Sequence, residues 1–187
     1  MRMLEIKVPQ VEIFDSNTNT FANLKSTTFR FEHSLIAISK WEQKWHKSLL
    51  KGLELGNLSD DAFLDYIRCM SLDSRVTLED IELRSNDDFL KQIVDYLNDP
   101  ASATILYNME PENKSHETVT SEVIYCWLAM CRIPFDPCEK WNINRVLKLL
   151  DVYNLKTNPP KKMSPSEILK WQQKENERRK RELNTRG

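Results

Sequence analysis

The spacing of apolar residues changes at His33, and this change limits the class of fold that the chain can adopt. Before it, apolar and polar residues alternate in 4–8, 11–14 and 27–32, a period of two that predicts β-strands. After it, apolar residues recur every three or four positions, which predicts amphipathic helices. We therefore expect an α+β fold that is mainly α, with a small antiparallel β-hairpin or sheet at the N-terminus.

Residues that cap helices mark the expected helix starts. Ser34, Ser59 and the 85–88 run each precede an apolar stripe with helical spacing. We expect the first helix to end near Gly52 or Gly56, because glycine readily adopts the left-handed conformation found at many helix ends.

The most apolar helix is expected over 122–132, where apolar residues occur on most sides. This pattern predicts burial against several neighbours, with Cys126 and Trp127 in the interior. Asp136 and Pro137 predict the start of the next helix, because aspartate caps helices and proline suits the first helical position. We expect these two helices to form a hairpin.

A proline pair at 159–160 predicts the end of the globular part, because proline disfavours helix at its own position and at the one before. We expect a single α+β globular domain over 1–160, β-rich over 1–32 and helical over 33–158. A basic helical tail is expected over 161–187. This tail holds nine basic and four acidic residues, a net charge of +5, whereas the whole chain has −1 and the globular part therefore −6.

Composition argues against two kinds of protein. The chain has three glycines, far below the usual share of about 7%, which leaves few places for a phosphate-binding glycine loop. No apolar run approaches the ~18 residues of a membrane span, and the N-terminus lacks the apolar block of a signal peptide. We therefore expect a soluble intracellular protein with no membrane partner.

The reactive residues form no recognisable catalytic or metal-binding pattern. Cys126 and Cys131 are five positions apart, and five positions turn a helix by ~140°, so their side chains would diverge. Free, buried thiols are the favoured interpretation. The histidines are His33, His46 and His116, and the sequence places none of them beside a thiol. We expect a protein that is not an enzyme, with no catalytic residue, cofactor or metal.

Two tryptophans, Trp41 and Trp45, lie on the apolar stripe of the first expected helix. Aromatic residues flanked by lysines can stack on a nucleic acid, but a position on the apolar stripe favours burial in the core or an interface. We interpret the stretch as a core helix, with Trp41 partly exposed as an anchor for a partner helix. The expected partner-binding residues are Trp41, Trp45, Trp171, Arg178, Arg179, Lys180 and Arg181.

Seven segments carry a family resemblance: His33–Trp41, Asp65–Met70, Thr120–Trp127, Ile133–Phe135, Lys140–Leu147, Pro159–Ser164 and Leu183–Gly187. Together they resemble a group of tailed-bacteriophage morphogenesis proteins, the tail assembly chaperones. The matching positions are core and cap residues, so the resemblance brings no ligand set or catalytic motif with it. It implies a non-enzymatic role in the cytoplasm of the host cell, where the protein would shield hydrophobic helices of a tape measure protein and help tail tube subunits assemble around it.

Two other functions stay open from the sequence. One is a structural component of the phage particle, in the neck, tail tip or baseplate, whose N-terminal strands would add to a neighbour's sheet. The other, which the mixed charge of the tail argues against, is a nucleic-acid binder. Its phosphate contacts would be Lys161, Lys162, Arg178, Arg179, Lys180 and Arg181.

Overall fold

The computed structural model describes residues 3–15, 19–104, 118–158, 173 and 176–177. The chain divides into two compact units, Met1–Asp151 and Val152–Gly187. The expected domain limit at 160 and nearly all of the expected tail over 161–187 lie outside the described residues, so both stay predictions. Residues 103–107, whose sequence resembles a strand, also lie largely outside them.

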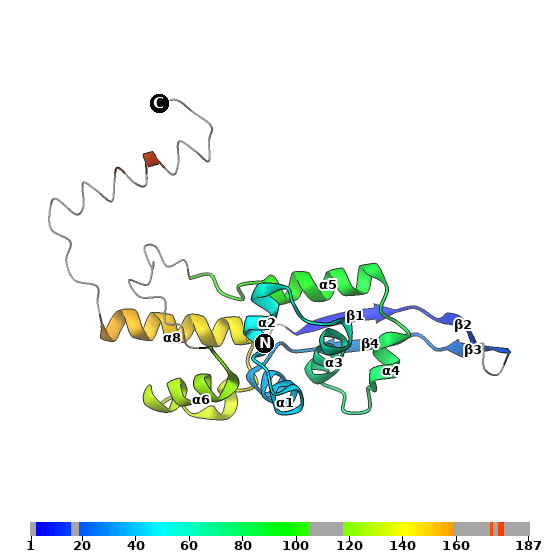
Figure 1. Ribbon diagram of the computed structural model, residues 1–187, viewed down its shortest axis with the longest axis horizontal. Helices are drawn as coiled ribbons and strands as arrows, with labels where there is room; N and C mark the ends of the chain where they lie inside the picture. The colour runs from blue at the N-terminus through cyan, green and yellow to red at the C-terminus, as the bar shows by residue number, and fades with distance from the viewer. Residues whose placement is uncertain (1–2, 16–18, 105–117, 159–172, 174–175, 178–187) are drawn as a thin grey trace. The chain divides into compact units, whose positions relative to one another are not determined.

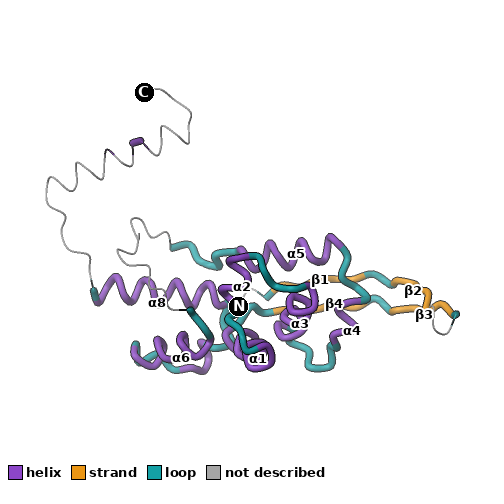
Figure 2. The backbone as a smooth tube through the Cα atoms, viewed as in Figure 1, coloured by secondary structure: helices purple, strands orange, loops and turns teal. Residues whose placement is uncertain are grey.

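The described residues confirm an α+β fold that is mainly α (Figures 1 and 2). The strands are β1 (Leu4–Val8), β2 (Val11–Asp15), β3 (Thr20–Leu24) and β4 (Thr27–Phe31). The helices are α1 (Leu35–Trp45), α2 (Leu49–Leu55), α3 (Asp60–Met70), α4 (Leu78–Glu82), α5 (Asp87–Asn98), α6 (Ser121–Met130), α7 (Phe135–Cys138) and α8 (Ile143–Thr157).

The strands form two short antiparallel ladders that follow one another along a hairpin. β1 pairs with β4, and β2 pairs with β3, a strand that the alternation of residues did not predict. The first ladder ends before Pro9, which lacks the N–H group that would continue it. β2 and β3 extend beyond the helices, as Figure 1 shows.

One face of the β1–β4 ladder forms part of the core. Ile6, Val8, Phe29 and Phe31 alternate with exposed residues and are buried. Phe89 of α5 meets the rings of Phe29 and Phe31 edge-on, with ring centroids 6.1 and 5.9 Å apart. The alternation in the sequence therefore places every second side chain of these strands against a helix.

The segment after His33 forms two helices where one was expected. α1 begins behind Ser34, as predicted, but it ends at Trp45 because His46 adopts the left-handed conformation at φ 51°. α2 then runs up to Gly56, which is left-handed at φ 60°. The prediction of one helix ending near Gly52 or Gly56 is therefore wrong, although Gly56 does end a helix.

Capping explains the next three helices. Ser59 caps α3 and Asn86 caps α5, each by accepting a backbone N–H of the first turn, as the sequence predicted. α4 was not predicted. Its five residues begin with a capping box between Thr77 and Asp80 and bury only Ile81.

α6 is much less buried than its composition predicts. Ser121, Ile124 and Leu128 are its buried residues, whereas Met130 is 75% exposed. Trp127 is only half-buried. The expectation of burial on most sides is wrong, because α6 lies against α1 with one side and leaves the opposite side uncovered.

The start of α8 also differs from the prediction. Asp136 does not cap a long helix: its backbone is non-helical, and it lies inside the short α7. α8 begins later, behind Asn142, whose side chain accepts the backbone N–H of Asn144 at 3.0 Å. With α7 in between and α6 packed on α1, the expected hairpin of two long helices is not formed.

Candidate functional site

Of the two tryptophans proposed as partner anchors, Trp41 belongs to the interior and Trp45 lies at its edge. Trp41 is 0% exposed, and its indole N–H donates to the carbonyl oxygen of Ala62 at 2.8 Å. Trp45 is half-buried, stacks on Trp41 with ring centroids 5.8 Å apart, and donates to Asp65 Oδ2 at 2.8 Å. The expectation that Trp41 is partly exposed is therefore wrong, since the face of α1 that carries it packs against α3.

The cations beside these tryptophans have a structural partner. Asp65 is buried and forms ion pairs with Lys44 at 2.9 Å and with Arg68 at 3.0 Å. Burial raises the pKa of Asp65, but hydrogen bonds from Trp45, Lys44 and Arg68 outweigh that effect and lower it. Lys44 is thus engaged within the fold, which argues against a nucleic-acid clamp at this place.

The remaining predicted partner-binding residues stay predictions, because they lie outside the part of the chain that the structure describes. They are Trp171, Arg178, Arg179, Lys180 and Arg181.

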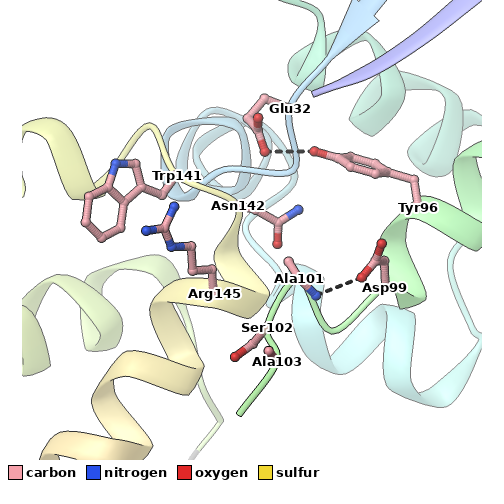
Figure 3. Close-up of a pocket in the computed structure, with 9 residues that line it drawn as sticks. All are labelled: Glu32, Tyr96, Asp99, Ala101, Ser102, Ala103, Trp141, Asn142 and Arg145. Atoms are coloured by element: carbon pink, nitrogen blue, oxygen red, sulfur yellow. Dashed lines mark hydrogen bonds between the residues drawn. The ribbon is translucent and has the colours of Figure 1, made fainter. Parts of the chain in front are cut away.

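A cavity of about 560 Å³ opens where the chain leaves β4 (Figure 3). Its walls come from three parts of the chain: the residue after β4, the end of α5 with the loop that follows, and the start of α8. The lining residues are Glu32, Tyr96, Asp99, Ala101, Ser102, Ala103, Trp141, Asn142 and Arg145.

Glu32 is the least exposed acidic group of this cavity. Its side chain is 1% exposed, and the Tyr96 hydroxyl donates to Oε1 at 2.7 Å. Oε2 has no hydrogen-bond partner among the described residues. Burial raises the pKa of Glu32, and the hydrogen bond from Tyr96 and the nearby amide of Asn142 offset only part of that rise. Glu32 therefore carries one buried oxygen, Oε2, that lacks a hydrogen-bond donor among the described residues.

Backbone and amide hydrogen bonds hold the walls together. Ile143 N–H donates to the carbonyl oxygen of His33 at 2.7 Å, which joins the start of α8 to the end of β4. The side-chain amide of Asn144 donates to the carbonyl oxygens of Leu97 and Asp99 at 2.9 and 2.8 Å. These contacts join segments far apart in sequence, so the pattern of the sequence gives no signal for them.

His33, beside Glu32, is a buried structural residue. It is 2% exposed, and its Nδ1 shares a hydrogen bond with the hydroxyl of Tyr66. Burial lowers the pKa of His33 to about 4 and raises that of Tyr66 well above its usual value. Both groups are therefore neutral at neutral pH, and neither contributes charge to the cavity.

Arg145 supplies the only cationic side chain among the residues that line the cavity. Its guanidinium lies over the ring of Trp141, 4.5 Å from the centroid, in a cation–π contact. No described carboxylate forms an ion pair with it. The sequence analysis singled out none of Glu32, Tyr96, Asn142 and Arg145, because single polar residues at unrelated positions form no motif.

A second candidate surface is apolar and lies on α6 and α7. Cys126, Ala129, Met130 and Phe135 are exposed there, Met130 by 75% and Phe135 by 44%. Ala129 and Phe135 also line a hollow of about 340 Å³, together with Ile133 and neighbouring residues. We refer to the four exposed residues as the α6–α7 surface. Three of these residues lie on the uncovered side of α6, the most apolar helix, and Phe135 begins α7.

This exposure changes the expectation for the thiols. Cys126 is exposed, so its predicted burial is wrong, whereas Cys69 and Cys138 are buried and burial raises the pKa of both. We expect iodoacetamide at neutral pH to modify Cys126 well before Cys69 and Cys138, because only accessible thiolates react. Mass spectrometry of timed samples measures the order, with urea-unfolded protein as the control. Equal rates in the folded protein would contradict the burial of Cys69 and Cys138.

Two features are absent from the described residues. They contain no group of three or more His, Cys, Asp or Glu side chains arranged to hold a metal ion. None of the helices within them has the length and apolar character needed to cross a bilayer.

Comparisons of the chain with models of protein families, with curated proteins and with solved structures each find no match. The resemblance to tail assembly chaperones therefore stays a prediction from the sequence segments given above.

Proposed function

We propose that the protein is a non-enzymatic phage tail morphogenesis protein, a tail assembly chaperone that binds helical segments of a tape measure or tail tube protein. The observation that carries this proposal is the α6–α7 surface. Apolar side chains on an exposed surface mark sites of protein interaction, and here they lie on α6 and at the start of α7.

The geometry suits an amphipathic helix as partner. α6 buries Ile124 and Leu128 against the body and presents Cys126, Ala129 and Met130 on its other side. A partner helix could lay its apolar stripe along this side, as in other helix-in-groove complexes. Methionine is flexible and polarisable, which suits a surface that must accept helices of different sequence.

The family resemblance supports the identity of the partner, and the basic tail supports its approach. Tape measure proteins are the partners that the resemblance implies. The cations Arg178–Arg181 would attract acidic segments of such a partner and accelerate encounter, an effect that salt weakens.

We expect Met130→Glu to reduce co-purification of the partner by about tenfold or more, because a charge in an apolar interface must be desolvated without a counter-ion. The measurement is co-expression with the tape measure or tail tube protein of the same phage, followed by affinity capture and solubility analysis. Stability should stay within about 0.5 kcal/mol, since Met130 is mostly exposed.

The matched control is Leu55→Glu, which places the same charge on an apolar side chain of α2 that is 60% exposed. It should leave the capture unchanged. Equal loss with both variants would remove the α6–α7 surface as the binding site. No gain in partner solubility with the wild-type protein would argue against chaperone function itself.

A second candidate function rests on the β2–β3 ladder. It contains two strands, so the outer edge of each has no strand partner within the described residues, and Phe21 of β3 is 72% exposed. Such an edge can accept a strand from a neighbouring protein, as a permanent component of the particle would require. Mass spectrometry of purified virions separates the two functions, because a chaperone is absent from them and a component is present.

A further inference from the structure

The exposed side of α6 combines an apolar middle with opposite charges at its two ends. At 3.6 residues per turn, four exposed positions of this helix fall within an arc of about 100°: Glu122, Cys126, Ala129 and Met130. Arg132 is also exposed, follows just after the end of α6, and lines a hollow together with Ala129. We call these five residues the α6 stripe. It begins with an acid and ends with a cation.

We propose that a second copy of the chain binds the α6 stripe, with the two α6 helices antiparallel about a two-fold axis near position 127. This dimer uses part of the surface assigned to the proposed function but does not depend on that function, because the protein needs no other partner to associate with itself. In such a dimer the apolar residues of the stripe are covered until a partner helix displaces the second copy.

The charges of the stripe are self-complementary only in the antiparallel arrangement. Glu122 and Arg132 each lie five positions from position 127, roughly 7 Å along the helix axis. A two-fold axis at that position brings Glu122 of each copy to the same end as Arg132 of the other, so two ion pairs form. A parallel pair of helices would instead place like charges together at both ends. Charge complementarity therefore favours the antiparallel pair.

Both charged groups are available for contacts with a second copy. Among the described residues, neither Glu122 nor Arg132 forms an ion pair. Hydrogen bonds, first of all from its own backbone N–H group, lower the pKa of Glu122, so this carboxyl group is ionised at neutral pH. On α7, Asp136 and Lys140 already pair with each other at 2.6 Å. They therefore compete little for the charges of the stripe.

The apolar middle of the stripe suits close packing of two helices. Cys126 and Ala129 lie one and two positions from the axis, and small side chains at a contact let helices approach to about 8 Å. The flexible side chain of Met130 can fill the space beside the second helix. Each copy contributes mainly one helix of ten residues. We therefore expect a small interface and a reversible dimer with a Kd of roughly 10–100 μM.

The experiment is analytical ultracentrifugation of the full-length protein over concentrations that span this Kd. We expect a monomer at the low end and a dimer at the high end. Glu122→Arg and Arg132→Glu should each weaken the dimer by about tenfold or more, because each places like charges together at both ends. The double variant should restore the Kd to within about threefold. Glu54→Arg, a reversal at an exposed position of α2, should leave it unchanged, and circular dichroism checks the folding of each variant.

Chemical cross-linking locates the axis even if a charge variant fails to fold. Above the Kd, a short bis-maleimide should join two copies through Cys126, the exposed thiol beside the axis. Cys126→Ser should remove this cross-link, and Cys131→Ser should keep it. A monomer at every concentration, a double variant that does not restore the dimer, or a cross-link that survives Cys126→Ser would overturn the proposal. Because these measurements use the protein alone, such a result would leave the proposed function untouched.

Discussion

Replacement of Glu42 by alanine is expected to lower the free energy of unfolding by about 3–5 kcal/mol. Glu42 is 7% exposed, and its two oxygens accept two backbone N–H groups: Leu49 N–H at 3.0 Å and Ser121 N–H at 2.7 Å. These are the first residues of α2 and α6, so one carboxylate satisfies donors at two helix N-termini. Alanine would leave both donors buried or partly buried without an acceptor. Urea unfolding followed by circular dichroism measures the loss.

Two companion variants show whether the effect comes from capping. Glu54→Ala removes a carboxylate from an exposed position of α2 and should change stability by no more than about 0.5 kcal/mol. Glu42→Gln keeps one acceptor oxygen but turns an NH₂ group towards the other donor, so its cost should lie between the two. A loss below about 1 kcal/mol for Glu42→Ala would show that water replaces the carboxylate at both helix ends.

Replacement of Trp41 by alanine is expected to cost about 3–5 kcal/mol, the range for loss of a buried aromatic side chain. The change opens a cavity between α1 and α3, removes the stacking with Trp45, and leaves the carbonyl oxygen of Ala62 without its donor. The same denaturation experiment measures it. Trp41→Phe retains most of the packing but lacks the indole N–H group. The stability that this variant loses therefore reports the hydrogen bond to Ala62.

Trp45→Ala is the matched comparison for Trp41→Ala. Trp45 is half-buried at the edge of the same stack, so its loss should cost clearly less. Equal costs for the two substitutions would contradict the assignment of Trp41 to the core and of Trp45 to its edge. The comparison also tests the correction to the sequence analysis, which expected Trp41 to be partly exposed.

Local signals predicted the starts of several helices. Ser34, Ser59 and Asn86 are capping residues directly before apolar stripes, and each caps a helix in the structure. Such signals act within one helical turn, so they can be recognised from the sequence alone. The alternation of apolar and polar residues in β1 and β4 could be recognised equally well, because one face of this ladder is buried.

Other features could not be predicted because tertiary contacts decide them. His46 ends α1 in a conformation more typical of glycine, and no sequence rule marks that position. α6 was expected to be buried because it is apolar, but α1 and α7 contact only part of its surface and leave Cys126 and Met130 exposed. The five residues of α4 are too few to show a helical period.

The candidate sites depend on still longer connections. Glu42 accepts the backbone N–H of Ser121 at the start of α6, and these two residues are 79 positions apart in the sequence. Glu32 and its donor Tyr96 are 64 positions apart. Both glutamates read as ordinary polar residues in a sequence, because their role depends on which segments the fold brings together. The exposed α6–α7 surface has the same origin: composition predicts apolarity, and only packing decides exposure.

The break between the two β-ladders confines errors of strand register to one part of the hairpin. In the inner ladder, Ile6 faces Phe29 and both are buried, so a slip of one residue would turn core side chains towards water. The outer ladder of β2 and β3 is joined to it through unpaired residues 9–10 and 25–26. A residue inserted in β2 or β3 would shift the pairing of the outer ladder. The unpaired residues between the ladders would accommodate that shift without changing the inner register. The tip of the hairpin is thereby free to vary in length and sequence while the core keeps its alignment.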